Sequence, residues 1–511
     1  MSKSRSHLKR ALCWLTAVLL LLAAAAAAFF LLTPRTAPGP ALDAMLAASR
    51  QRQIEALAPG SALSAPAAEC FELRRAGEPE QHFRRASALL TVTRLDVDAL
   101  TADLAPEMQT HVQETVTAAK RRSDVYAEDG SYLPAVVTDA YEKALSARLT
   151  DLSGYLETFT LPLSLSYADG SWKLTDPSAL DGLLPSLPSS PGCAEAAAQL
   201  VPVAFHYKLP DRTSPGPVPD SSRFGWFEDP AELLTLLESE EAVRLINGQN
   251  LDFDPANVLP GRGVHYYLDE TILAIVWQQD EHGAVGTFAE VFLADASQLR
   301  RKLAGDTFGS EARFYPSELA AQANAVVAVS GDFYNSGRPT YGLCVYDGQL
   351  MRSCLTAGDT CLFTDEGDMV FAYENSFSSE AEAQDFLDSR RVMFSLAFGP
   401  VMIDHGEDVT PYSYPLGEVL DTYARCAIGQ LGKLHYLAMT INCESPDHYV
   451  YVTLRQAADS MLAHNCYNAY TLDGGQTGSI LIGGKLINPV QFGYEREMSD
   501  IFYFSTAIPD T

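Results

Sequence analysis

An apolar run from Ala11 to Leu32 constrains the fold of this chain more than any other feature. At the helical rise of about 1.5 Å per residue it spans about 33 Å, roughly the thickness of the hydrocarbon core of a bilayer. The residues before it are basic, which predicts that the N-terminus stays in the cytoplasm while the rest of the chain crosses the membrane. This basic cluster comprises Lys3, Arg5, Lys9 and Arg10.

A cleaved signal peptide is the alternative interpretation of this run. The alanines at 23–28 offer a small-residue cleavage site. However, Phe29 to Leu32 continue the apolar run beyond them, and the run is longer than the core of a usual signal peptide. We therefore expect an uncleaved single-pass anchor in the cell membrane, with the N-terminus cytoplasmic and the C-terminal domains extracytoplasmic.

The charge balance argues against one class of partner. The 511 residues carry a formal net charge of −29, whereas nucleic-acid binding depends on basic patches that face phosphates. We expect no nucleic-acid partner. Hydrophobic residues make up 47% of the chain, enough for several folded domains. Cys70 and Cys193 bracket the first soluble region as one candidate disulfide pair, with buried free cysteines as the alternative.

Proline-rich stretches divide the chain. PSLPSSP at 185–191 and PDRTSPGPVP at 210–219 are typical of linkers. Upstream of them, a helix followed by long hairpins resembles NTF2-like accessory domains. The expected segments are a cytoplasmic N-terminus and transmembrane anchor (1–33), a juxtamembrane linker and helix (34–66), a small α+β accessory domain (67–184), a Pro/Ser-rich linker (185–222) and a C-terminal domain (223–511).

The C-terminal domain is predicted to be α/β, with a mixed sheet. Its apolar and alternating runs predict strands at 265–268, 271–277 and 287–293. Helical periodicity predicts helices between and around them. These helices are expected at Pro230–Leu245, Ala296–Leu303, Pro316–Asn324 and Leu454–His464.

The stretch Tyr470–Ile480 ends a buried strand on a carboxylate. Asp473 is followed by Gly474 and Gly475, where a ligand or a second strand can approach the backbone, and by the hydroxyl of Thr477. Taken alone, Asp-Gly is most simply a hairpin turn. Two further stretches lie next to apolar runs. AVVAVSGDFYN at 325–335 ends the run 326–329, and RCAIGQ at 425–430 precedes the run 434–441.

Together these stretches resemble the phosphodiester glycosidase family over roughly residues 260–508. The family pattern is N-G-[GD]-[FY]-[FY], then R-x-A-I-G, then L-D-G-G-x-S. Here it is present as Ser330-Gly331-Asp332-Phe333-Tyr334, Arg425-Cys426-Ala427-Ile428-Gly429 and Leu472-Asp473-Gly474-Gly475-Gln476-Thr477. Ser330 departs from the usual Asn, and Gln476-Thr477 from the usual Gly-Ser. The segment Arg496–Asp500 is similar to the start of the family's closing strand.

The resemblance implies a hydrolase that cleaves sugar-1-phosphodiesters. A pair of carboxylates is the usual equipment for the sugar side of such chemistry, and Asp332 and Asp473 form the candidate catalytic pair. Arg425 suits the phosphate, because a guanidinium binds phosphate oxygens bidentately. The candidates for other substrate contacts are Gly331, Asn335, Asn442, Gly474, Gly475 and Thr477.

Simpler readings stand beside each of these assignments. Asp332 could cap a turn after its strand, and Arg425 could belong to a structural salt bridge. Glu444 and Asp447, with Asp473, could hold a divalent cation, although no cofactor is firmly predicted. The expected substrate is a sugar-phosphate glycan or polymer of the cell envelope. The alternative is a non-catalytic glycan-binding or envelope-scaffold protein that retains the fold.

Overall fold

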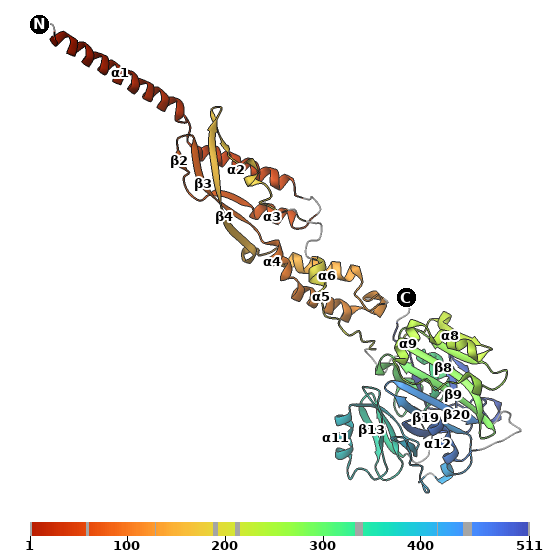
Figure 1. The fold of residues 1–511 in the computed structure, drawn as a ribbon. Helices are drawn as coiled ribbons and strands as arrows, with labels where there is room; N and C mark the ends of the chain where they lie inside the picture. The colour runs from red at the N-terminus through yellow and green to blue at the C-terminus, as the bar shows by residue number, and fades with distance from the viewer. Residues whose placement is uncertain are drawn as a thin grey trace. The chain divides into compact units, whose positions relative to one another are not determined.

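The computed structural model describes residues 3–57, 61–127, 129–185, 187, 193–209, 215–332, 341–415, 417–442 and 452–508. Two compact units are present (Figure 1). Unit 1 comprises residues 1–118 and 125–203, and unit 2 comprises residues 119–124 and 204–511.

Helix α1 (Lys3–Leu32) contains the apolar run (Figure 1). Its segment Leu12–Phe29 makes no buried contacts and is long and apolar enough to cross a membrane. A signal sequence near an N-terminus meets the same criteria. The predicted N-terminal apolar helix is thus confirmed.

Unit 1 combines helices with one antiparallel sheet, ordered β1-β3-β4-β5, with β2 paired to β3. Its long strands alternate buried and exposed residues, so one face of the sheet meets the helices. Cys70 carries a free thiol, so the candidate Cys70–Cys193 disulfide is not formed. The elements are α2 (Pro38–Glu55), α3 (Ser64–Cys70), β1 (Glu72–Arg75), β2 (Glu80–His82), β3 (Arg85–Leu95), α4 (Val97–Ala102), α5 (Ala105–Ala118), α6 (Pro134–Arg148), β4 (Leu156–Ala168), β5 (Ser171–Leu174) and α7 (Cys193–Ala197).

Unit 2 is organised around a nine-stranded sheet in its described part, ordered β18-β17-β21-β19-β20-β9-β8-β7-β6. Its central strands are buried along almost their whole length, because other layers cover both faces. The strands are β6 (Phe224–Phe227), β7 (Val264–Leu268), β8 (Ile272–Glu281), β9 (Ala284–Leu293), β17 (Val401–Asp404), β18 (Glu407–Asp408), β19 (Arg425–Gly432), β20 (His435–Asn442) and β21 (Asn468–Leu472).

A second sheet of unit 2 has the order β10-β24-β11-β22-β23. Its strand β24, the last described strand in sequence, lies between β10 and β11. Two small sheets, β15-β14-β16 and β12-β13, complete the described strands. The elements are β10 (Leu299–Leu303), β11 (Val327–Ser330), β12 (Gly342–Tyr346), β13 (Gln349–Cys354), β14 (Thr360–Thr364), β15 (Met369–Ala372), β16 (Val392–Leu396), β22 (Ile480–Ile482), β23 (Lys485–Leu486), β24 (Asp500–Phe504), α8 (Leu233–Leu237), α9 (Glu240–Ile246), α10 (Pro316–Ala323), α11 (Glu380–Arg390) and α12 (Leu454–Ala463).

The predicted α/β class of unit 2 is confirmed, and two predicted helices need correction. Ala296–Leu303 is a short 3₁₀ turn followed by strand β10, whose side chains are all buried. Its apolar residues at Leu299 and Leu303 imitate helical spacing, but pairing with β24 decides the conformation. Pro230–Leu245 is divided, because Ser239 caps the start of a second helix through its side chain.

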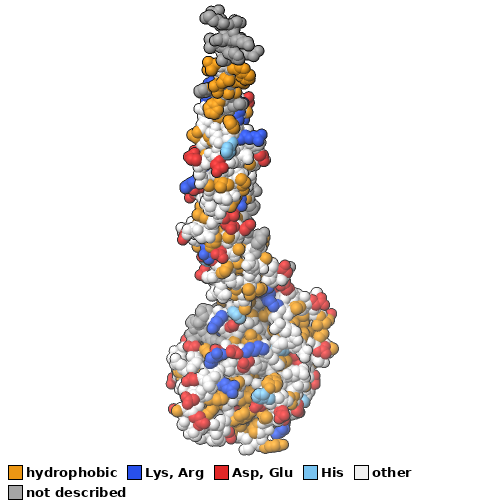
Figure 2. All heavy atoms as spheres, turned by 60° about the vertical axis from the view of Figure 1, so that its left-hand side comes forward, with side chains coloured by type: hydrophobic (Ala, Val, Ile, Leu, Met, Phe, Trp, Pro, Cys, Tyr) orange, Lys and Arg blue, Asp and Glu red, His pale blue; other side chains and the backbone are white. Residues whose placement is uncertain are grey.

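Charged side chains of both signs lie on the surface of the protein. On the face drawn in Figure 2, basic side chains are interspersed with acidic ones rather than gathered in one stripe. Mixed charge of this kind favours solubility over binding to a polyanion.

Candidate functional site

The three motifs meet where strands of both sheets end. The first follows β11, the second begins β19, and the third follows β21. Cys426 lies opposite Leu472 in the β19–β21 ladder, so the second and third motifs are cross-strand neighbours. Val329 lies opposite Ile480 in the β11–β22 ladder, which places the first motif beside the end of the third.

Ser330 joins the first motif to the third. Its buried hydroxyl donates to Thr477 O at 2.6 Å and accepts from Ser479 N at 2.7 Å. Its own amide donates to Ser479 O at 3.2 Å. The residue that departs from the family pattern therefore has a structural role here: it holds the segment after the glycine turn against β11.

Cys426 marks the point where all three motifs come together. Burial raises the pKa of its thiol to about 12, a side-chain hydrogen bond with Ser330 opposes that rise, and the nearby Asp473 carboxylate adds to it. The thiol is therefore protonated at neutral pH and acts as a small packing group.

The glycine turn packs directly on the start of β19. A Cβ on Gly474 would lie 2.1 Å from Ala424 O, so only glycine permits this approach. Gly475 has a φ of +64° and donates its amide to Ala424 O at 3.0 Å. That amide is therefore occupied, whereas the Gly474 amide has no hydrogen-bond partner among the residues that the structure describes.

Two other predicted site residues support the same turn. The Thr477 hydroxyl donates to Gly474 O at 2.5 Å, and the Asn442 amide donates to Gly475 O at 3.4 Å. Asp473, at the head of the turn, is partly exposed. Thr477 and Asn442 thus both hold the glycine turn that follows Asp473, and their contacts with a substrate stay a prediction.

The Arg425 side chain is held by backbone carbonyls. Its Nη1 donates to Val419 O at 2.8 Å, its Nε donates to Val452 O at 3.1 Å, and its Nη2 donates to Asp421 O. Burial lowers the pKa of Arg425 to about 10. Within the described ranges no carboxylate forms a salt bridge with it, although the charge of the Asp421 carboxylate opposes part of this fall in pKa.

Asp332 points into a buried ionic cluster. Its Oδ1 pairs with Arg301 Nη2 at 2.8 Å, and its Oδ2 accepts from Ala397 N at 2.9 Å. Arg301 also binds Asp500 Oδ2 through Nε at 2.8 Å. Burial raises the pKa of Asp500; Arg301 lowers it and Asp332 raises it further, with a net upward shift. One guanidinium is therefore shared by two carboxylates, and Asp332 is fixed in place.

The remaining predicted residues divide into two groups. Gly331 is placed by the ionic cluster, since a Cβ there would lie 2.2 Å from Asp500 Oδ2. Asn335, Glu444 and Asp447 lie outside the described residues. Within those residues, no group of three His, Cys, Asp or Glu side chains is arranged to hold a metal ion.

Sequence reasoning missed Arg301 altogether. The residue belongs to the segment that was expected to be helical, and nothing local marks it as the partner of residues 332 and 500. The signal that could have found it is a row of three cations, Arg300, Arg301 and Lys302, in a segment that must be buried between apolar neighbours.

Residues 323–505, which hold all three motifs, match a protein-family model described as phosphodiester glycosidase. This region is similar to that family. Among curated proteins, the SPbeta prophage-derived uncharacterized protein YomE of Bacillus subtilis (strain 168) is 29% identical over 208 residues. That alignment covers 40% of this chain and 31% of YomE, so the chain spans under a third of its relative's length.

Two solved structures are also similar to the phosphodiester glycosidase domain. The catalytic domain of zebrafish N-acetylglucosamine-1-phosphodiester alpha-N-acetylglucosaminidase, auto-inhibited by its pro-peptide, is 18% identical with a TM-score of 0.38. The alignment covers 47% of this chain and 84% of that one. A hypothetical protein from Synechocystis is 13% identical with a TM-score of 0.34, covering 46% of this chain and 62% of that one.

Proposed function

We propose that unit 2 hydrolyses a glycosyl-phosphodiester, the bond between the anomeric carbon of a sugar and a phosphate, in an extracytoplasmic glycan such as an exopolysaccharide of the cell envelope. The observation that carries this proposal is the environment of Arg425. It is a buried cation that forms no salt bridge among the described residues, although the Asp421 carboxylate lies near enough to raise its pKa, and its strand begins directly under the glycine turn.

The physical reason is the cost of burying charge. Moving a cation out of water costs several kcal/mol, and proteins usually offset it with a paired carboxylate. Among the described residues, Arg425 uses three of its five N–H groups on backbone carbonyls, which leaves two donors, and its charge is offset by the nearby Asp421 carboxylate without a salt bridge. A phosphodiester supplies the missing negative charge and matches the two remaining donors.

The reaction that this site would support breaks the bond between the anomeric carbon and the phosphate oxygen. Water adds to the sugar carbon, and the phosphate leaves as a monoester. Asp473, partly exposed at the turn, is the carboxylate best placed to stabilise the oxocarbenium-like transition state or to activate water. The Gly474 amide is a further donor for the leaving phosphate.

Asp332 has a different part in this proposal. Both of its oxygens are held by Arg301 and Ala397, so we assign it to positioning the end of β11 rather than to direct proton transfer. The same observation favours a second candidate function. If the site needs two reactive carboxylates, it would bind a sugar-phosphate glycan without cleaving it.

The experiment measures release of sugar from an array of sugar-1-phosphodiesters by the full chain in detergent. We expect turnover by the wild type, a loss of at least a hundredfold in Asp473→Asn, and reduced affinity for phosphate-bearing substrates in Arg425→Gln. EDTA in a parallel reaction tests the need for a divalent cation. The matched control is Asp347→Asn, which changes an exposed Asp before Gly348 at the β12–β13 turn and should leave turnover unchanged.

The outcomes separate the two functions. Turnover that survives Asp473→Asn removes the hydrolase assignment for this carboxylate. Binding of sugar phosphates without release of sugar, lost in Arg425→Gln, would replace the hydrolase with the glycan-binding function.

A further inference from the structure

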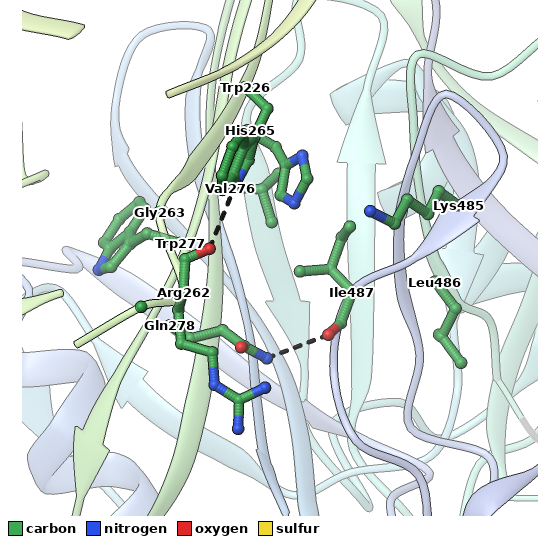
Figure 3. Close-up of a pocket in the computed structure, with 11 residues that line it drawn as sticks. Trp226, Arg262, Gly263, His265, Val276, Trp277, Gln278, Lys485, Leu486 and Ile487 are labelled. Carbon is green, nitrogen blue, oxygen red and sulfur yellow. Dashed lines mark hydrogen bonds between the residues drawn. The ribbon is translucent and has the colours of Figure 1, made fainter. Parts of the chain in front are cut away.

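A cavity of unit 2 lies at the edge of the nine-stranded sheet. It has a volume of about 560 Å³ and is formed by β6, the loop before β7, β7, β8 and the segment that contains β23 (Figure 3). The described residues that line it include no Asp or Glu, although the chain carries a net charge of −29. Arg262 and Lys485 give it a positive lining.

The aromatic wall of this cavity is fixed in orientation. Trp226 is 48% exposed, and its indole Nε1 donates to Arg262 O at 3.3 Å. Gly263 lies beneath it with a φ of +65°, and a Cβ at that position would lie 2.6 Å from the same nitrogen. Trp226 is therefore held as a partly exposed platform, with little conformational freedom left to lose when a ligand binds.

The opposite wall is also held in place. Gln278 donates through Nε2 to Ile487 O at 3.0 Å, which ties the segment after β23 to β8. The glycine turn between β22 and β23 packs on β6, since a Cβ on Gly483 would lie 3.1 Å from a ring carbon of Phe224. Figure 3 shows the Lys485 side chain pointing across the cavity toward His265.

The polar groups of this cavity suit a ligand with hydroxyls and one negative charge. Burial, aided by the positive charge of Lys485, lowers the pKa of His265 to about 4, so its ring is neutral and can accept a hydrogen bond. Lys485 is exposed and forms no salt bridge within the part of the chain that the structure describes.

We propose that this cavity is a second, non-catalytic binding site for an anionic saccharide, with the sugar ring on Trp226 and its phosphate or carboxylate at Lys485. None of the described residues that line the cavity belongs to the three motifs. Thr477 and Lys485 are eight positions apart in the sequence, so even a fully extended chain keeps their Cα atoms within about 29 Å of each other. A glycan of several units is long enough to contact both.

The saccharide is favoured over a nucleotide by the lining. A single exposed indole face and neutral acceptors suit the C–H face and hydroxyls of a sugar. The acidic character of the chain disfavours longer nucleic acids.

The test measures binding of glucose 1-phosphate, glucuronic acid, glucose and AMP by calorimetry and ligand-observed NMR. The protein is the full chain in detergent carrying Asp473→Asn, which prevents turnover without touching the cavity. A failure of the hydrolase assignment therefore leaves this test intact. We expect the two anionic sugars to bind and glucose to bind at least tenfold more weakly.

Two cavity variants locate the binding. Trp226→Ala and Lys485→Ala are each expected to weaken binding of the anionic sugars at least tenfold, and both change exposed side chains. Lys433→Ala is the matched control, because this exposed lysine lies in the same unit but pairs with Asp368. The proposal is overturned if the anionic sugars do not bind, if both cavity variants retain wild-type affinity, or if AMP binds more tightly than the sugars.

Discussion

Replacing Ser330 by alanine tests the joint between the first and third motifs. The Ser330 hydroxyl is completely buried, so no water can replace it. The substitution leaves the Ser479 amide without its acceptor at 2.7 Å. It also removes the donor at 2.6 Å from Thr477 O, although that carbonyl keeps a second donor, the Ser479 hydroxyl, at 3.1 Å.

The expected loss follows from these two bonds. An unsatisfied buried amide costs about 1–3 kcal/mol, and the net loss of a hydrogen bond to a carbonyl that keeps another donor costs about 0.5–1.5 kcal/mol. We therefore expect Ser330→Ala to lower the free energy of unfolding of unit 2 by about 2–4 kcal/mol. In a large domain each kcal/mol of lost stability lowers the Tm by about 2–4 °C, so the Tm of unit 2 falls by roughly 4–16 °C.

Hydrogen exchange locates the effect. The Ser479 amide should exchange at least tenfold faster in Ser330→Ala than in the wild type, because each 1.4 kcal/mol of lost protection is about tenfold in rate. Ser389→Ala is the control: this exposed serine donates only to Phe386 O within its own helix, and the change should stay within about 0.5 kcal/mol. If Ser479 keeps its protection and the variant is as stable as the control, the Ser330 hydroxyl does not hold the first and third motifs together.

Other substitutions test the surrounding structure. Gly331→Ala forces a Cβ into a buried carboxyl and should destabilise unit 2 by about 1–3 kcal/mol in denaturant unfolding, whereas Gly77→Ala, with open space around it, should be close to neutral. Arg425→Lys removes the planar fork that binds three carbonyls, and should increase exchange of the 417–421 segment while α11 stays protected. Burial lowers the pKa of His464, but hydrogen bonds to Asp252 and Glu281 outweigh it and raise the pKa to about 9. The stability from this charge is therefore complete below about pH 6.5 and is lost as the pH rises toward 9; His464→Gln should flatten that part of the pH–stability curve, and an unchanged curve would contradict the assignment.

Much of the candidate site could be predicted because its signals are local. Each motif pairs an apolar run with a turn residue whose chemistry is readable from sequence, and Gly474 is a glycine for the reason expected, close approach of backbone. Thr477 and Asn442, two of the residues predicted to contact substrate, both bind the turn that follows Asp473, while their role in substrate binding stays a prediction.

What could not be predicted depends on contacts between residues far apart in sequence. Arg301 reaches Asp332 and Asp500 only because β10 pairs with β24, across about 200 residues. The local pattern of β10 predicts a helix, and the pairing overrides it. In the sequence Ser330 is only a departure from the family's usual Asn, whereas in the fold its hydroxyl binds Thr477 and Ser479.

The position of β11 between β22 and β24 has a consequence for synthesis of the protein. Both strands that pair with β11 follow it by about 150 residues or more, so β11 keeps two unpaired edges until residues 480–504 have been made. Loop closure over that distance is slow compared with formation of local helices and hairpins. The nascent chain therefore carries an exposed apolar strand for about half of the time that unit 2 is being translated, and factors that shield such strands should determine how much of the protein reaches its folded form.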